Sequence, residues 1–278
     1  MKLFGFIYIR GINMTTKLSV VIITYNEEKN ISRCIKSVQA IADEILVVDS
    51  HSTDNTVDVA QRLGAKVLIH SFEGHIQQKN WAKDQAEFPF VLSLDADECL
   101  SPELQESILA EKKQGFHFSG YHMNRLNFVK NRPIKGCGWY PDKKLRLFNI
   151  TQGKWRGKNP HDTFVLNYGL SKQHLKGEIY HYSYNSNGAI IKQAIKFGKI
   201  GAKSLRSLNL LVLIYKLIFS PPAKFLRNYF LKFGIIYGIT GLTICVGQLI
   251  ECYIKYFGGI MRKINPSKSS ALKTPSMA

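Results

Sequence analysis

Four short apolar runs follow one another in the first half of the chain, and segments long enough for helices separate them. The runs cover residues 20–23, 45–48, 66–69 and 90–94. Continuous β-branched runs of this length are typical of strands in a parallel sheet that is covered on both faces. The pattern therefore predicts an α/β fold with a mostly parallel, Rossmann-like sheet and flanking helices. Right-handed crossovers then place the carboxyl ends of the strands at one edge.

The segments between the runs have helical spacing. The first carries one apolar helix face, which is made of Ile31, Cys34, Ile35, Val38 and Ile41. In the second, the polar residues 52–54 predict the start of a helix that ends at Gly64. The alternation of strands and helices is that of βαβ units.

Polar residues cluster where three of the strands end. They are residues 24–28 after the first strand, 49–54 after the second and Asp95-Ala96-Asp97 after the fourth. Ligands of open α/β sheets bind outside the carboxyl ends of the strands, and Mg²⁺ or Mn²⁺ bridges carboxylate to phosphate oxygens. The triplet therefore predicts a metal–diphosphate site, although it is also typical of an acidic turn on a solvated surface.

The motifs at 24–27, 47–56 and 94–98 resemble, in order and spacing, those of the family 2 inverting glycosyltransferases of GT-A fold, over about residues 17–185. Residues 142–148, 153–155 and 160–162 resemble the branch that adds sugars to the inner core of bacterial lipopolysaccharide. That branch more often has Gly at the position of His51 and Glu at the position of Asp162. His tolerates a positive φ less readily than Gly, and Asp shortens the side chain by one methylene.

The resemblance implies a UDP-sugar as donor. Asp49 resembles the residue that accepts the imide N–H of uracil, and Thr24, Tyr25 and Glu27 look like the pocket around base and ribose. Lys79 resembles a basic residue that family members bring to the diphosphate. A turn or helix-capping role for Asp49 and a solvated position for Lys79 are the structural alternatives.

The resemblance also implies a metal site and a base. Asp95 is expected to face the ribose or the metal, and Asp97 to coordinate Mg²⁺ or Mn²⁺ directly. Asp162 is the candidate base that takes the proton of the acceptor hydroxyl during inversion, and its alternative is a surface turn. His161 is a second candidate base, or a scaffold residue. Arg146 is expected to contact phosphate or to be a half-exposed strand arginine.

Charge is distributed unevenly along the 278 residues. Residues 1–111 carry 10 Lys+Arg and 16 Asp+Glu, whereas residues 112–278 carry 28 and 4. The second half therefore requires an anionic partner, which is phosphorylated lipid A, an acidic membrane leaflet or nucleic acid. Nucleic acid ranks last because no zinc-finger, RNP or helix-turn-helix pattern is visible. Five scattered cysteines without a CxxC pair indicate a reducing cytoplasm and no zinc site.

Basic and apolar segments follow one another in the last third of the chain. Residues 191–206 form a basic amphipathic helix, with the cations Lys192, Lys196, Lys199, Lys203 and Arg206 at helical spacing. An apolar stretch at 208–219 and an uncharged stretch at 233–250 follow. A membrane span takes ~20 residues, so we expect monotopic insertion at the cytoplasmic face of the bacterial inner membrane; a true span and ordinary core helices are the alternatives.

These patterns divide the chain into an amino-terminal extension at 1–16, a GT-A domain at 17–188, a membrane-associating helical region at 189–264 and a disordered tail at 265–278. The predicted function is inverting transfer of a glucose-like hexose to a lipid-linked saccharide such as lipopolysaccharide core. Capsule or exopolysaccharide assembly is the alternative within the class. A sugar nucleotidyltransferase lacks support because no Gly-rich loop follows the first strand, and a non-catalytic nucleotide-sugar-binding protein would lack a base.

Overall fold

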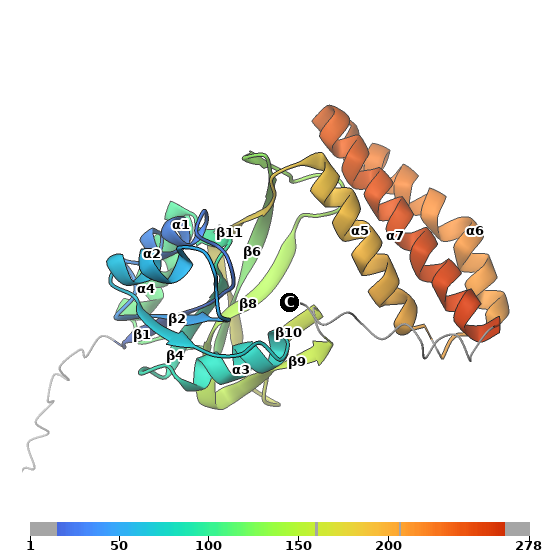
Figure 1. Ribbon diagram of the computed structural model, residues 1–278. Helices are drawn as coiled ribbons and strands as arrows, with labels where there is room; N and C mark the ends of the chain where they lie inside the picture. The colour runs from blue at the N-terminus through green and yellow to red at the C-terminus, as the bar shows by residue number, and fades with distance from the viewer. Residues whose placement is uncertain (1–15, 159–160, 206, 265–278) are drawn as a thin grey trace, which may run out of the picture. The chain divides into compact units, whose positions relative to one another are not determined.

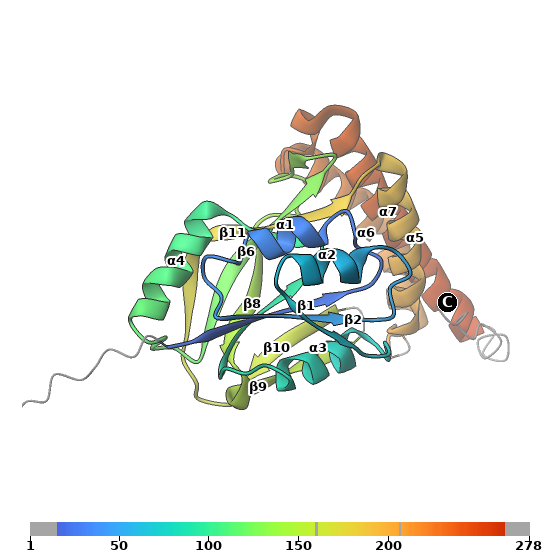
Figure 2. The ribbon, with the colours of Figure 1, turned by 60° about the vertical axis from the view of Figure 1, so that its left-hand side comes forward.

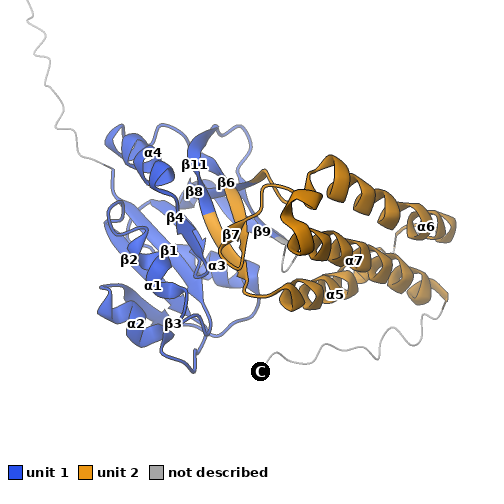
Figure 3. Ribbon diagram, turned by 90° about the horizontal axis from the view of Figure 1, so that it is seen from above, with its two compact units in different colours: residues 1–124, 143–179 blue, residues 125–142, 180–278 orange. Residues whose placement is uncertain are grey.

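The computed structural model describes residues 16–158, 161–205 and 207–264. The predicted amino-terminal extension up to residue 15, Arg206 of the basic helix and the predicted disordered tail lie outside these ranges. The chain forms two compact units (Figure 3). Unit 1 comprises residues 1–124 and 143–179, and unit 2 comprises residues 125–142 and 180–278.

The four predicted strands are present and parallel. They are β1 (Leu18–Thr24), β2 (Glu44–Asp49), β3 (Lys66–Ile69) and β4 (Phe90–Asp95). Strand β1 lies between β2 and β4, and β2 pairs with β3, each in parallel. The predicted mostly parallel α/β architecture of this half is therefore confirmed.

Later strands extend this sheet. They are β5 (Glu98–Leu100), β6 (Gly120–Val129), β7 (Arg132–Pro133), β8 (Asp142–Asn149) and β11 (Lys172–Tyr184). The order across the sheet is β3-β2-β1-β4-β8-β6-β11-β5, with β7 paired to β6. Strands β9 (Gly153–Lys158) and β10 (His161–Leu166) form a separate antiparallel pair. Because β8 runs antiparallel to β4, its last residue Asn149 lies beside Phe90 at the start of β4, and its earlier residues lie toward the edge where β4 ends.

Helices cover both faces of the sheet in unit 1 (Figures 1 and 2). Helices α1 (Ile31–Lys36), α2 (Thr56–Arg62) and α4 (Pro102–Lys113) lie on one face, and α3 (His75–Asp84) lies on the other beside β9 and β10. The side chains of β1 alternate between two cores accordingly. Val20 packs in the core with α1, and Val21 packs in the core with α3.

The predicted helix over 31–41 is shorter than expected. Helix α1 ends at Lys36, and the chain continues to Ile41 as turns. The five apolar positions of its predicted face are nevertheless all fully buried. The second predicted helix is α2, and Gly64 after it has the positive φ of 85° expected at a helix end.

Unit 2 contains three long helices, α5 (Asn187–Lys203), α6 (Leu210–Leu226) and α7 (Gly238–Ile264), which lie side by side (Figure 1). A π-helical turn (Arg227–Leu231) and a 3-10 turn (Gly234–Tyr237) connect α6 to α7. Helix α7 continues well beyond the uncharged stretch at 233–250. Residues 234–264 are, by length and composition, long and apolar enough to cross a membrane.

The basic amphipathic helix is confirmed as α5. Its basic residues Lys192, Lys196, Lys199 and Lys203 are exposed. Its buried face consists of Ile190, Ala194, Gly198 and Ala202. A Cβ added at Gly198 would lie 2.8 Å from the Cβ of Ile254, so α5 and α7 approach closely at small residues.

Candidate active site

The ends of β1, β2 and β4 lie at one edge of the sheet. Thr24 at the end of β1 pairs in register with Asp49 at the end of β2, and Ile23 pairs with Asp95 at the end of β4. Parallel strands in this register send their following loops to the same side. The predicted convergence of three acidic loops on one edge is therefore confirmed.

Hydrogen bonds join the loops after β1 and β2. The N–H of Asn26 donates to the Ser52 hydroxyl at 2.8 Å, and the N–H of Thr53 donates to the side-chain oxygen of Asn26 at 2.8 Å. The buried carboxylate of Asp49 accepts the N–H of Ser52 at 2.7 Å and also the Ser52 hydroxyl. Asp49 therefore fixes the shape of this loop, as the structural alternative anticipated.

His51 keeps the loop conformation that a glycine would have. Its φ is 63°, in the left-handed region, which costs a residue with a Cβ about 1 kcal/mol. The Nε2 of His51 lies 3.1 Å from the hydroxyl oxygen of Ser71. This contact offsets part of the backbone cost of a residue with a Cβ at this position.

The three other residues of the predicted nucleotide pocket differ in exposure. Thr24 is buried, and its hydroxyl makes no hydrogen bond with any residue in the described ranges. Tyr25 is half exposed, and Glu27 accepts a hydrogen bond from the side-chain amide of Asn30 at 2.7 Å. A buried hydroxyl whose hydrogen-bonding capacity is unused at a binding edge is available to a ligand.

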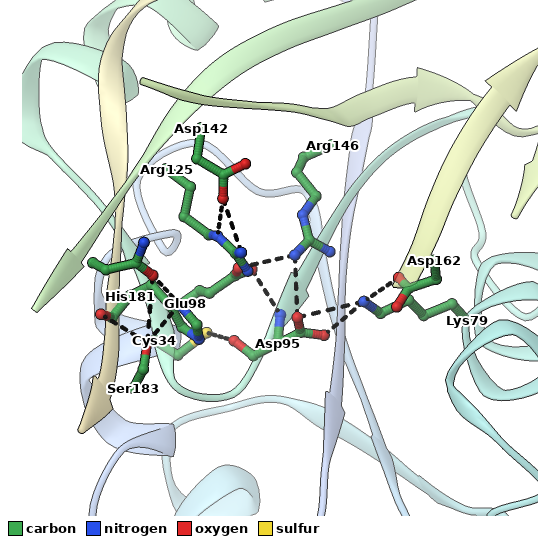
Figure 4. Close-up of polar contacts among 11 residues, drawn as sticks. Cys34, Lys79, Asp95, Glu98, Arg125, Asp142, Arg146, Asp162, His181 and Ser183 are labelled. Atoms are coloured by element: carbon green, nitrogen blue, oxygen red, sulfur yellow. Dashed lines mark hydrogen bonds and ion pairs between the residues drawn. The ribbon is translucent and has the colours of Figure 1, made fainter. Parts of the chain in front are cut away.

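Lys79 lies between Asp95 and Asp162 in a cluster of charged side chains (Figure 4). It projects from α3 and is 3% exposed, so the solvated position considered for it is wrong. Its Nζ lies 3.0 Å from Oδ1 of Asp95 and 2.8 Å from Oδ2 of Asp162. It also lies 4.8 Å from the centre of the Trp155 ring. Lys79 thus connects the carboxylate triplet to the candidate base.

Arg146 belongs to the same cluster and is 3% exposed, so the half-exposed arginine expected for β8 is wrong. Its Nη2 lies 2.9 Å from Oε1 of Glu98 and 3.1 Å from Oδ2 of Asp95. Burial alone lowers the pKa of Arg146, but the carboxylates of Glu98, Asp95 and Asp162 outweigh burial and raise that pKa above its usual value. The guanidinium is therefore a permanent cation among these acids.

The buried side chain of Glu98 supports the Asp95-Ala96-Asp97 triplet. It is 1% exposed, and while its Oε1 accepts from Arg146, its Oε2 accepts the backbone N–H of Asp95 at 3.1 Å. Asp95 is therefore held through its backbone by Glu98 and through its side chain by Lys79 and Arg146. These contacts fix the orientation of the first carboxylate of the triplet.

Asp162 reaches the cluster from β10, where it pairs with Gly157 of β9. Its side chain is 10% exposed and approaches Lys79 from the side opposite Asp95 (Figure 4). The surface turn considered for Asp162 is wrong, because the residue lies in a strand and forms a buried ion pair. His161 precedes it in β10, but the side chain of His161 is outside what the structure describes.

Comparison with known proteins gives the family. The model described as Glycosyl transferase family 2 matches residues 19–176, which is more than half of the 278 residues. The chain belongs to glycosyl transferase family 2. An uncharacterised glycosyltransferase of Rickettsia conorii is 30% identical to this glycosyltransferase, over 95% of the chain and 94% of the relative.

Two further comparisons describe other glycosyltransferases. The lipopolysaccharide core biosynthesis glycosyltransferase LpsC of Rhizobium meliloti is 27% identical, over 77% of this chain and 80% of the relative. The crystal structure of S. aureus TarS 1–349 in complex with UDP aligns with a TM-score of 0.42 at 17% identity, over 90% of this chain and 92% of that chain.

The acidic turn Asp95-Ala96-Asp97 of this glycosyltransferase suits a metal ion that takes its remaining ligands from a bound diphosphate and from water. In the described ranges, no group of three or more His, Cys, Asp or Glu side chains gathers as a metal cage. Mg²⁺ usually binds one or two carboxylates and takes its other ligands from phosphate and water. Asp95 and the partly exposed Asp97 supply that number of carboxylates. The donor set therefore fits a divalent ion that arrives with a diphosphate.

Two residues that position the site carry no signal of their own in the sequence. Asn80 donates its amide N–H to the carbonyl of Trp155 at 3.0 Å and accepts the N–H of Trp155 at 2.9 Å, which fixes β9 against α3. Gln78 donates to the Ser50 hydroxyl at 3.1 Å. Both are ordinary polar residues of a helix, and only the packing of α3 against the sheet reveals their contacts.

Proposed function

We propose that this glycosyltransferase moves a glucose-like hexose from a UDP-sugar to a lipid-linked saccharide, such as lipopolysaccharide core, with inversion at the anomeric carbon. The observation that carries the proposal is the position of Lys79, which contacts the triplet through Asp95 and the candidate base Asp162 at the same time. A cation for the diphosphate and a carboxylate for the acceptor hydroxyl are thereby adjacent, as a displacement between the two requires.

Asp162 acts as the base in this proposal. Its carboxylate accepts the proton of the acceptor hydroxyl while that oxygen attacks the anomeric carbon from the face opposite the diphosphate. Lys79 binds the diphosphate and so exchanges its contact with Asp162 for a phosphate oxygen. The low exposure of both side chains supports the proposal, because charges act more strongly where water is excluded.

Asp97 and Asp95 would hold Mg²⁺ or Mn²⁺. The ion supplies positive charge that stabilises the departing nucleoside diphosphate. Arg146 and Glu98 act indirectly, because they fix Asp95 and do not reach solvent. Their contribution is to preserve the geometry of the triplet when donor binds and product leaves.

The nucleotide pocket is proposed at the ends of β1 and β2. Asp49 would accept the uracil imide N–H, and Thr24, Tyr25 and Glu27 would surround the base and ribose. The buried hydroxyl of Thr24, which has no partner among the described residues, supports this placement. Asp49 can serve the loop and the base together, since a carboxylate offers about four acceptor sites.

The acceptor and the location are proposed from charge and hydropathy. A lipid-linked acceptor agrees with the name of the LpsC relative and with the basic, apolar second half. We place the enzyme peripherally at the cytoplasmic face of the bacterial inner membrane, with the helices of unit 2 in the interface and their cations at anionic headgroups.

A donor and acceptor screen tests the proposal. Purified enzyme is incubated with a set of UDP-sugars and with lipid A–core acceptors of defined truncation, and enzyme-dependent UDP release is measured with the anomeric configuration of the product. One UDP-hexose is expected to support β-configured transfer from an α-linked donor to a single core truncation. Transfer only to polyisoprenoid-linked capsule or exopolysaccharide intermediates would favour the alternative, and retention of configuration would refute the role of Asp162.

A further inference from the structure

The connection between α6 and α7 in unit 2 presents a dense group of exposed apolar side chains, here called the apolar tip. It consists of Leu226, Phe230, Leu231, Phe233, Ile235, Ile236 and Ile239, and each of these is between 50% and 76% exposed. Soluble proteins seldom expose so many large apolar side chains together, and such patches mark interaction surfaces. The tip therefore requires an occupant.

The apolar tip is held in place by the loop after β6. The N–H of Lys135 donates to the Tyr237 hydroxyl at 2.9 Å, and the N–H of Cys137 donates to the carbonyl of Lys232 at 2.9 Å. Arg132 donates to the carbonyl of Ile236 at 3.3 Å and stacks 4.8 Å from the centre of the Tyr237 ring. These contacts hold the tip in a conformation that leaves its apolar side chains exposed.

Gly136 shows how closely the loop approaches the tip. A Cβ added there would lie 2.7 Å from the Tyr237 ring and 2.9 Å from the Lys232 carbonyl. Beneath this contact, Ile134 packs with Ile244 in a buried apolar cluster of unit 2. The tip consequently has its own core and does not depend on a partner for its shape.

Positive charge surrounds the apolar tip. Five exposed cations lie on the loop after β6 and on the connection between α6 and α7: Lys130, Arg132, Lys135, Arg227 and Lys232. The sequence has no Asp or Glu at positions 125–141 or 180–250. Apolar side chains that are ringed by cations are complementary to a bilayer surface with anionic headgroups above acyl chains.

We propose that the apolar tip inserts into the interface of an anionic bilayer, with the five cations at the lipid phosphates. A second copy of the chain is a poorer occupant, because a symmetric contact would bring the two rings of like charge together. The inference refines the membrane association proposed above and is independent of the sugar-transfer chemistry. It narrows insertion to the helix connection together with the loop after β6, whereas the sequence pattern indicates the whole stretches at 208–219 and 233–250.

Vesicle flotation of the full-length chain tests the insertion. The double variant Leu231→Ser with Ile236→Ser is compared with the control Tyr168→Ser, which removes a fully exposed aromatic side chain of unit 1. On phosphatidylethanolamine–phosphatidylglycerol vesicles, the binding constant of the double variant is expected to fall about tenfold or more, because two large apolar side chains no longer leave water. The control is expected to bind as wild type does. Unchanged binding of the double variant would overturn the proposal.

Two further measurements keep the outcome interpretable. Ile236→Trp is expected to show fluorescence quenching by brominated lipid beyond that of the three native tryptophans, whereas Tyr168→Trp is not. Lys130→Glu with Lys232→Glu is expected to weaken binding to the anionic vesicles about tenfold or more, and to leave binding to pure phosphatidylcholine unchanged. Absence of quenching at Ile236→Trp would overturn the proposal. If the tip substitutions abolish self-association of the chain without changing flotation, the tip binds a protein partner and the proposal is also overturned.

Activity separates this inference from the proposed function. UDP release with a water-soluble acceptor fragment is expected to be equal in wild type and in the tip variants. Loss of flotation with unchanged soluble-acceptor turnover supports the tip. Normal flotation of a wild-type protein that transfers no sugar would count against the proposed function alone.

Discussion

Lys79 contacts two carboxylates, and their fates on donor binding differ. Asp95 is also held by Arg146, whereas Lys79 is the cation that approaches Asp162 in the described ion pairs. In the proposed function, a diphosphate that engages Lys79 would leave Asp95 in position and free Asp162 for the acceptor. The two acids nearest the lysine would then have separate roles, one in geometry and one in proton transfer.

The first prediction concerns the base. Asp162→Asn keeps the shape of the side chain but cannot accept the acceptor proton, so kcat is expected to fall by ~10²–10⁴-fold with nearly unchanged UDP-sugar affinity. Steady-state kinetics and donor titration measure the two quantities separately. If donor binding collapses and turnover of bound donor survives, Asp162 belongs to the nucleotide pocket, and His161 becomes the candidate to test.

The second prediction concerns the metal. Asp97→Asn removes the charge that a hard cation needs while it preserves the fold, so transfer is expected to be abolished. Excess EDTA is expected to have the same effect on wild type, and added Mn²⁺ or Mg²⁺ to restore it. Full activity of the variant, or of wild type in chelator, would refute the metal assignment.

The third prediction concerns Arg146. Replacement by Met removes the guanidinium partner of the buried Glu98 carboxylate, which is expected to cost about 3–5 kcal/mol of unfolding free energy. Arg146→Lys keeps the charge but loses the rigid planar group that places Nη2 between Glu98 and Asp95, so it is expected to retain most stability and to lose kcat with little change in KM.

Lys83→Met provides the matched control, because Lys83 pairs with Asp84, whose side chain is 60% exposed. Its effect on unfolding by urea is expected to stay below about 1 kcal/mol. Equal losses for Arg146→Met and Lys83→Met would show that the Arg146 network carries no special energetic weight.

At the scale of elements, the residue before the N-cap of α2 makes the hydrogen bond that caps the helix. Asn55 occupies the capping position without a side-chain hydrogen bond, whereas Asp54 accepts the N–H of Thr56 at 3.0 Å and the N–H of Glu28 at 3.3 Å. Slight burial by itself raises the pKa of Asp54, but the hydrogen bonds from Thr56 and Glu28 prevail and lower it. The carboxylate therefore ties the start of α2 to the loop after β1.

The fourth prediction follows from this lowered pKa. Because the folded state prefers the ionised form, Asp54 stabilises the fold above its unfolded pKa of about 3.9 and loses that contribution as the pH falls through its lower folded value. Asp54→Asn is expected to cost about 1 kcal/mol or less at pH 7. Urea unfolding at several pH values is expected to show the difference vanish in acid. A difference that persists at the lowest pH would mean that the amide is simply a poorer cap.

Strand positions and the end of α2 at Gly64 were predictable from sequence, but the end of α1 was not. Residues 90–94 are a continuous apolar run, and a run of that kind has few alternatives to a buried strand. Helix α1 ends at Lys36 because the Ser37 hydroxyl donates to the Cys34 carbonyl at 2.7 Å and accepts the N–H of Leu100 at 3.1 Å. That second contact spans 63 positions of the chain, and no local pattern encodes it.

The candidate site was predictable to the same extent. Its loops follow strands, so Asp49, Asp95 and Asp97 were found from their positions alone. The burial of Arg146 depends on β8 pairing with β4 in the register that sets Leu147 opposite Leu92. Pairing between distant strands is a tertiary property, and an alternating strand pattern gives only the faces of one strand.

At the scale of the whole molecule, the two halves of the chain have opposite net charge. The acidic first half contains Asp49, Asp95 and Asp97 of the candidate site, whereas the basic second half contains Asp162 and forms all of unit 2. Close packing of α5 on α7 at Gly198 turns the lysines of α5 outward. In the proposed function the donor diphosphate binds unit 1 and the anionic membrane binds unit 2, so the two interactions are expected to be weakened independently.

The last prediction uses this separation. Lys192, Lys196, Lys199 and Lys203 on α5 are expected to contribute ~1 kcal/mol each near an anionic leaflet, and less beyond a Debye length of ~10 Å at 0.1 M salt. Their reversal to Glu is expected to weaken flotation with anionic vesicles and to leave UDP binding unchanged. High salt alone is expected to release little wild type, because apolar insertion is not screened. If the quadruple variant floats as wild type does at low and at high salt, α5 does not face the membrane, and its lysines serve another anionic partner.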